Sequence, residues 1–300
     1  MEEVGRIYRY GNVPEAALVA DVVPPPVDAR RNLVRRVQDR LAGAGRMQEV
    51  LSYSFQSDAL LDILGMSDEP HVRVINPVAA GLSRVRRAVL PSLLGVLTEG
   101  RRQREDLRLF EVGKAYVPDP NGEDGQPTER HELALVWATP QGSANERFDH
   151  ARLLHLRGIL QDLFDHLGLE TPTWERDDQP LSWAHPARAL VVRVHDSAQP
   201  LARLADLHPE VALALGLEGE LASDTALAQV SLDVVLAAPR KVSSYVPIPR
   251  FPGVKLDVAV LTSEDTRAGD VRALIEKAGK RSEGHTSELQ SRRNLGCRPL

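Results

Sequence analysis

The fold class is decided by two successive stretches of sequence, LRLFEVGKAYV at Leu107–Val117 and HELALVWAT at His131–Thr139. Both are rich in aliphatic, aromatic and β-branched residues, which is typical of strands. The residues between them, 118–130, are polar and include glycine and proline, which indicates a surface loop. Two strands that follow one another without a helix favour antiparallel pairing over the βαβ order of a doubly wound parallel sheet.

Further strands are expected on both sides of this pair. Ala189–His195 and Leu201–Leu207 predict a hairpin, and Leu227–Leu236 predicts another strand. Glu49–Phe55 alternates, with Leu51, Tyr53 and Phe55 on one face and serines on the other, which is typical of a half-buried strand. A short strand is also expected at Val72–Ile75. We therefore expect an antiparallel sheet with helices on one side.

Several helices are indicated by apolar spacing. Leucines recur from Leu153 to Leu167 at spacings of three and four residues, which predicts one amphipathic helix with a core-facing stripe, ended by Gly168. Asp28 can cap a helix over Ala29–Ala42. Other helices are expected at Asp58–Leu64, Pro91–Arg102, Glu210–Leu215 and Arg267–Ala278.

Composition places the chain among globular proteins. It has 300 residues with 42% apolar and 26% charged residues and a net charge of −5, which argues against disorder and against a uniformly basic nucleic-acid coat. No apolar run is long enough to span a bilayer, and the start Met-Glu-Glu differs from a signal peptide, so a cytosolic location is favoured. The only cysteine, Cys297, argues against a disulfide framework and a thiolate metal site.

Arginines are concentrated in two segments although the chain as a whole is acidic. Six lie between Arg30 and Arg46 against the single acid Asp39, and seven lie between Arg84 and Arg108 against three acids. Either segment could meet phosphate groups or an acidic partner. The alternative, a solvated helix face balanced by acids elsewhere in the fold, is favoured.

Motifs for catalysis are few. The sequence contains no phosphate-binding glycine loop, no Gly-x-Ser-x-Gly elbow and no His-Glu-x-x-His pair. His185 and His208 each precede a proline and could serve as a general base or metal ligand, but a residue before proline is held extended, so structural roles are favoured. Glu2 and Glu3 are adjacent carboxylates that could hold a hard cation through oxygen.

Ordered motifs give the chain a resemblance to a known family. Glu2–Pro14 resembles the end of a DNA-binding-like domain, and Arg250–Asp257 resembles the opening of a ferredoxin-like anticodon-binding domain. The motifs between them follow the family's core domain in order: Glu49–Phe55, Asn76-Pro77, Ser83–Leu94, Leu107–Gly113, His185–Ala189 and Asp206–Val211. Residues 1–280 thus resemble the beta subunit of bacterial phenylalanyl-tRNA synthetase.

This resemblance implies a division into domains. The expected fold class is α+β, with a class II synthetase-like antiparallel sheet and flanking helices at 28–240, plus a truncated ferredoxin-like domain at 246–280. Residues 1–20 would be the C-terminal remnant of the DNA-binding-like domain, which makes the chain a C-terminal-half fragment. Residues 281–300 resemble a translated sequencing adapter and are expected to be an artefactual tail.

The resemblance also implies a non-catalytic role. The family's core domain has lost the chemistry, and the alpha subunit binds ATP and phenylalanine in an assembly of two alpha and two beta subunits. The beta subunit then assembles with alpha and positions tRNA for ATP-dependent attachment of phenylalanine. A family Mg²⁺ site uses two consecutive glutamates, which match Glu2 and Glu3. Its two aspartates would lie before Met1, so this site is expected to be incomplete and weak.

Two other classes of function remain open from the residues themselves. One is a free-standing hydrolase that uses His185 or His208. The other is a binding module unrelated to translation. Turnover by the isolated chain would favour the first, and failure to bind a synthetase alpha subunit would favour the second.

Overall fold

The computed structural model describes most of residues 1–242 and part of the chain beyond them. The described residues are 1–138 apart from 18, 78 and 105, 151–217 apart from 195, 196 and 198, 225–242, and then 245, 259–263, 266 and 268–279. Contacts divide the chain into one unit at Met1–Lys241 and a second at Val242–Leu300. Most of the strand expected at Val254–Leu261 and all of the tail at 281–300 lie outside the described residues.

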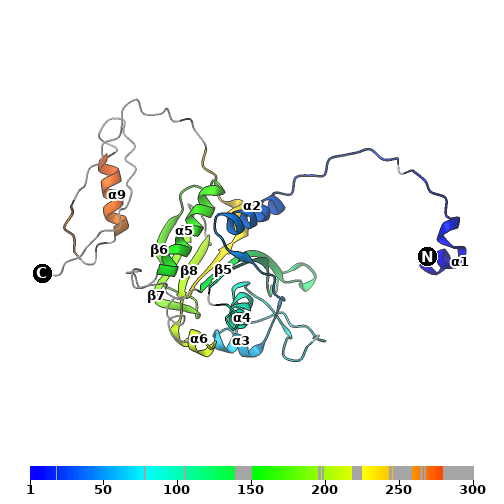
Figure 1. Cartoon of the computed structure of the whole chain (residues 1–300), viewed down its shortest axis with the longest axis horizontal. Helices are drawn as coiled ribbons and strands as arrows, with labels where there is room; N and C mark the ends of the chain where they lie inside the picture. Colours follow the sequence, from blue (N-terminus) through cyan, green and yellow to red (C-terminus); the bar gives the residue numbers. More distant parts are fainter. Residues whose placement is uncertain are drawn as a thin grey trace. The chain divides into compact units, whose positions relative to one another are not determined.

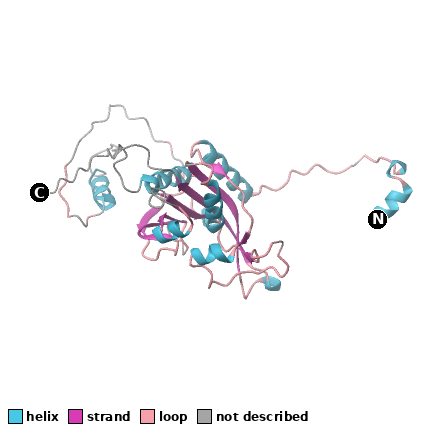
Figure 2. Ribbon diagram, turned by 60° about the horizontal axis from the view of Figure 1, so that its bottom comes forward, coloured by secondary structure: helices cyan, strands magenta, loops and turns pink. Residues whose placement is uncertain are grey.

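A seven-stranded sheet forms the centre of the first unit (Figures 1 and 2). Its strands, in spatial order, are β1 (Gln48–Glu49), β4 (Leu107–Val117), β5 (Thr128–Ala138), β9 (Thr225–Ser231), β8 (Ala202–Leu207), β7 (Ala184–Arg193) and β6 (Thr173–Arg176). Neighbouring strands are antiparallel except β1 and β4, which are parallel. The expected α+β class with a mostly antiparallel sheet is confirmed.

Helices cover both faces of this sheet. On β5, Leu133 and Leu135 belong to one hydrophobic core, whereas Ala134 and Val136 belong to the other. The first core contains residues of α2 (Ala29–Gly43), α5 (Ala151–His166) and α8 (Leu232–Ala237), and the second contains residues of α3 (Asp58–Ile63), α4 (Leu90–Gly100) and α6 (Pro209–Ala214). The expectation of helices on one side is wrong, because the residues of β5 from Leu133 to Ala138 are apolar on both faces.

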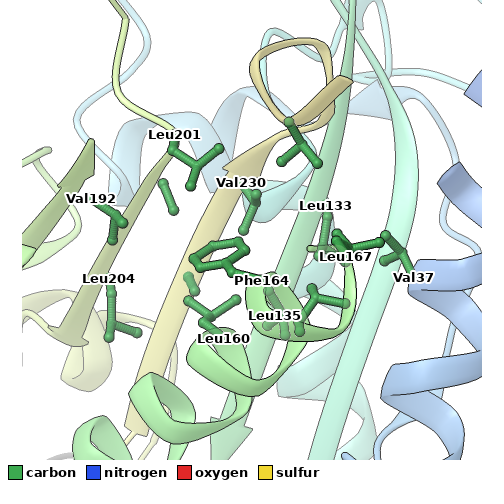
Figure 3. Packing of buried hydrophobic residues seen from close by; sticks show 14 of the residues in the cluster. Val37, Leu133, Leu135, Leu160, Phe164, Leu167, Val192, Leu201, Leu204 and Val230 are labelled. Carbon is green, nitrogen blue, oxygen red and sulfur yellow. The ribbon is translucent and has the colours of Figure 1, made fainter. Parts of the chain in front are cut away.

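The helices α2 and α5 form where the apolar spacing predicts them. The Asp28 side chain accepts the N–H of Arg31 at 3.0 Å and caps α2. Leu153, Leu156, Leu160 and Leu163 of α5 belong to the first core together with Phe164, which lies among side chains of β5, β8 and β9 (Figure 3). Gly168 follows α5 with φ of 72°, a left-handed conformation that glycine adopts without strain.

Other parts differ from the expected elements. The strand expected at Leu227–Leu236 ends at Ser231, whose hydroxyl accepts the N–H of Val234 and starts α8. The strand expected at Val72–Ile75 is reduced to one bridge between Arg73 and Arg84. The remaining elements are α1 (Glu2–Tyr8), a 3-10 turn at Tyr10–Asn12, β2 (Phe55–Gln56), β3 (Arg84–Val85), a 3-10 turn at Glu123–Gly125 and α9 (Ala268–Gly279).

Candidate functional site

The two glutamates assigned to a cation lie in the first turn of α1. Both are exposed, and one Glu3 carboxylate oxygen accepts from Arg6 Nη1 at 2.9 Å. Within the described part of the chain, no group of three or more His, Cys, Asp or Glu residues is placed to hold a metal ion. Two carboxylates supply too few oxygens for a hard cation. A Mg²⁺ site at Glu2 and Glu3 stays a prediction that requires further ligands.

The two histidines of the His-Pro pairs make local backbone contacts. His185 Nδ1 accepts the N–H of Ala187 at 3.1 Å, and His208 Nδ1 accepts the N–H of Glu210 at 3.2 Å. His208 is also the N-cap residue of α6. Capping and turn formation therefore explain both rings, in agreement with the structural roles favoured by the sequence.

A buried polar network lies beside β4, where several of the sequence motifs meet. Arg86 and Glu111 are 4% and 1% exposed, and Arg86 Nη1 lies 2.7 Å from Glu111 Oε1. The Ser52 hydroxyl donates to Glu111 Oε2 at 2.6 Å and accepts from Arg86 Nη1 at 3.1 Å. Arg86 Nε also donates to the carbonyl oxygen of Lys114 at 2.7 Å. The network thus joins three segments far apart in the sequence.

Glycine at position 113 makes room for this network. A Cβ at Gly113 would lie 2.3 Å from Arg86 Nη2 and 3.2 Å from Arg86 Cζ, which is too close for any side chain. Arg86 is further tied to its neighbours because its N–H donates to the Ser54 carbonyl and its own carbonyl accepts from Tyr116, both at 2.8 Å. A glycine inside a strand is the sequence signal that marks such a close approach.

Glu132 on β5 is a second buried carboxylate next to this network. It is 5% exposed and accepts the N–H of Val89 at 3.0 Å. Burial raises the pKa of Glu132, and this effect outweighs the opposing effects of the Val89 N–H, the Gln229 side chain and nearby arginines. The folded state therefore favours the protonated form of Glu132 more than the unfolded chain does.

We expect Glu132→Gln to change the pH dependence of stability. The folded-state pKa lies above the unfolded one, so the Glu132 contribution to stability is present below the unfolded pKa, near 4.3, and is lost as pH rises through the raised folded pKa. Glutamine does not ionise and can still accept the Val89 N–H. Melting curves from pH 4 to pH 8 should show the variant gaining on the natural protein as pH rises. A constant difference across this range would contradict the raised pKa.

Leu51 and Tyr53 point outward because Ser52, which lies between them, points inward. Leu51 and Tyr53 are each 84% exposed, whereas Ser52 between them reaches the buried ion pair. The strand expected over Glu49–Phe55 is wrong for residues 50–54, which lie in no strand between β1 and β2. The prediction that its apolar face packs inward is also wrong for Leu51 and Tyr53. A buried charged pair at this place needs the hydroxyl of Ser52, and successive side chains of an extended segment point to opposite sides.

The backbone at positions 51–53 also lacks backbone hydrogen bonds to other described residues. Strand β1 ends at Glu49, and Val50 donates to the Phe110 carbonyl at 2.9 Å. Among the described residues, the N–H and C=O groups of positions 51–53 form no backbone hydrogen bond. We call Leu51–Tyr53 the outer edge. It follows the edge strand β1 and combines two exposed apolar side chains with backbone groups that form no backbone hydrogen bond among the described residues, which makes it suitable for contact with another chain.

Six of the thirteen arginines in the two basic segments form ion pairs with acids among the described residues. Arg30 pairs with Asp233, and Arg40 Nε donates to Asp162 Oδ2 at 2.7 Å. In the second segment, pairs form between Arg84 and Asp58, Arg86 and Glu111, Arg87 and Glu69, and Arg108 and Asp106. For these six arginines the balance by acids that the sequence favoured is confirmed, although Arg86 is buried instead of solvated and Asp106 lies in the same segment as Arg108.

The fold and this site define an α+β domain with a mostly antiparallel sheet that presents a free edge beside a buried ion pair. Comparison with known proteins gives the family. The model of the phenylalanyl tRNA synthetase beta chain CLM domain matches residues 13–229, so the chain belongs to this family. In the described part of the chain, no helix has both the length and the apolar character needed to cross a membrane.

Curated relatives agree with the family match. Each is named phenylalanine–tRNA ligase beta subunit. The chain is 34% identical over 285 residues to that of Anaeromyxobacter dehalogenans, covering 92% of the chain and 34% of the relative. It is 31% identical over 288 residues to that of Geobacillus kaustophilus, covering 93% of the chain and 34% of the relative. The chain thus spans about a third of the length of the curated relatives it matches.

Proposed function

We propose that this chain is part of the beta subunit of a cytoplasmic phenylalanine–tRNA ligase. Its role is to assemble with the alpha subunit, in a complex of two alpha and two beta chains, and to position tRNA for ATP-dependent attachment of phenylalanine. The family match over residues 13–229 supports this role. The observation that carries it is the outer edge, where Leu51 and Tyr53 are exposed above a buried ion pair.

The same proposal divides the chain into domains. Residues 28–240 would form the catalytic-like but inactive core, with a class II-like sheet. The contact boundary between Lys241 and Val242 agrees with a separate second domain at 246–280 of ferredoxin-like type, to which α9 would belong. Residues 1–20 would be part of a DNA-binding-like domain.

The two subunits would bind different ligands. ATP and phenylalanine would bind to the alpha subunit, and Mg²⁺ would support the use of ATP. In this chain Glu2 and Glu3 would contribute oxygens to a Mg²⁺ site completed by other carboxylates. The described residues act by binding and orienting a protein partner and an RNA, and the buried network of Arg86 and Glu111 holds the outer edge in place for this purpose.

The proposed function predicts an effect of the outer edge on assembly. Leu51→Ser combined with Tyr53→Ser should weaken binding of the phenylalanine–tRNA ligase alpha subunit by about 30-fold, since an aromatic anchor at the centre of an interface typically contributes 2 kcal/mol or more. Both side chains are already exposed, so the melting temperature should hardly change. Sedimentation velocity or calorimetry with the purified alpha subunit measures the affinity.

Leu213→Ser is the matched control for this prediction. Leu213 lies on α6 and is 70% exposed, so Leu213→Ser removes an exposed leucine outside the outer edge. Its binding should equal that of the natural chain. If the natural chain does not bind the alpha subunit, the proposed function is wrong. If the outer-edge variant binds as well as the control, the function stands and the assigned surface is wrong.

A further inference from the structure

Two guanidinium groups donate to consecutive carbonyl oxygens at the C-terminal end of α5. Arg36 of α2 donates through Nη2 to the carbonyl oxygen of His166 at 2.7 Å. Arg240, which follows α8, donates through Nη1 to the carbonyl oxygen of Leu167 at 3.1 Å and through Nη2 to that of Val235 at 2.9 Å. Because His166 and Leu167 are consecutive residues, the two positive groups are neighbours although they are 204 positions apart in the sequence.

The backbone around Arg240 is fixed in this position. The carbonyl of Pro239 accepts the N–H of Glu170 at 3.1 Å, and the N–H of Lys241 donates to the Gly168 carbonyl at 2.8 Å. Figure 1 shows α2 and α5 next to one another on the same side of the sheet. Both arginines are thus presented by packed elements, which limits the loss of conformational entropy when they bind a ligand.

Two acids of α5 near this pair are engaged by other cations. Asp162 is held by Arg40, and Asp165 Oδ1 lies 3.0 Å from Lys241 Nζ. Among the described residues, neither Arg36 nor Arg240 forms an ion pair; both bind carbonyl oxygens only. The partial negative charge at the end of a helix favours this placement, but it is only about half an elementary charge for two full positive charges.

The positive charges of Arg36 and Arg240 are not balanced by an acid among the described residues. Burial and then the charge of Arg36 lower the pKa of Arg240, so the two groups repel one another. Each guanidinium has five N–H donors in a planar fork, and the carbonyls take only one from Arg36 and two from Arg240. An anion with several oxygens between the forks would relieve the repulsion and fill the remaining donors.

We propose that Arg36 and Arg240 form a binding site for a phosphate group of an RNA backbone. A polyanion is favoured over a single ion because α2 carries two more exposed arginines, Arg31 and Arg35, that form no ion pair among the described residues. Asp39 is the one acid on this helix. The site deepens the proposed function, because it places tRNA on this face of the chain.

The test compares two double variants that each remove two positive charges. The first is Arg36→Gln with Arg240→Gln. The control is Arg102→Gln with Arg104→Gln, two exposed arginines outside this site. Fluorescence anisotropy with labelled tRNA for phenylalanine, at 50 to 300 mM salt, should show binding weakened about tenfold by the first pair, with a salt slope smaller by about 1, as for one lost phosphate contact. The control should change neither by as much.

Three measurements decide the outcome. Equal binding of tRNA by the site variant and the natural chain would overturn the proposal, as would an equal loss in the control. Loss of alpha-subunit binding with unchanged tRNA binding would also overturn it, by assigning the arginine pair to a protein interface, while leaving the proposed function in place. If the double glutamine variant is unfolded, Arg36→Lys with Arg240→Lys replaces it. The lysines keep both charges but lack the planar set of guanidinium N–H donors, so tRNA binding should still fall at least threefold.

Discussion

Replacing Arg86 with methionine is expected to lower the free energy of unfolding by about 3–5 kcal/mol, because it leaves the carboxylate of Glu111 buried without a counter-ion. Glu111 is 1% exposed, so water cannot take the place of the guanidinium. The Ser52 hydroxyl would remain as the carboxylate's hydrogen-bond donor, but it carries no charge. Urea denaturation of the chain, followed by tryptophan fluorescence, measures the loss.

Two further variants serve as comparisons for Arg86→Met. Lys114→Met breaks the ion pair of Lys114 with Glu129, in which both side chains are 46% exposed, and should cost at most about 1 kcal/mol. Arg86→Met combined with Glu111→Leu removes both buried charges and should recover much of the lost stability. A cost for Arg86→Met as small as that for Lys114→Met would show that the pair is not buried as described.

Phe164→Ala is the second substitution with a large expected effect. Phe164 is fully buried in the first core, where its ring lies next to Leu160 and Val230 (Figure 3). The centroids of the Phe164 and Trp174 rings are 6.3 Å apart. Removing the ring loses its burial and leaves a cavity, at a cost of about 3–5 kcal/mol in the free energy of unfolding. Urea denaturation at constant pH provides this value.

Leu154→Ala on the same helix is the control for Phe164→Ala. Leu154 is 50% exposed, so its truncation leaves no cavity and should cost well under half as much. Similar costs at positions 154 and 164 would mean that α5 does not pack on the sheet through the face assigned to it.

The helices and the central strands could be predicted because their periodicity repeats over many residues. The leucines between Leu153 and Leu167 define one face of α5, and β4 has the bounds expected from its sequence. In strand β5 the residues from Leu133 to Ala138 are apolar on both faces, which indicates burial on both faces. Ala134 and Val136 therefore predict helices on the second face as well, contrary to the expectation of helices on one side.

The candidate site was harder to predict, because alternation gives a period but not a direction. The segment Glu49–Phe55 has polar and apolar faces, and the polar face is the inner one only because Arg86, Glu111 and Gly113 supply a buried partner for Ser52. Those residues are more than 30 positions away in the sequence. The pair of Arg36 and Arg240 depends in the same way on tertiary contacts with the end of α5.

The outer edge is the surface that we propose contacts the alpha subunit. The most direct test places a photoactivatable benzophenone amino acid at Tyr53 and, in a second protein, at Leu213, which are both well exposed. After irradiation with the alpha subunit, mass spectrometry identifies the cross-linked peptides. We expect a cross-link to the alpha subunit from position 53 and none from position 213. A complex that forms but cross-links from position 213 and not from position 53 would contradict the account.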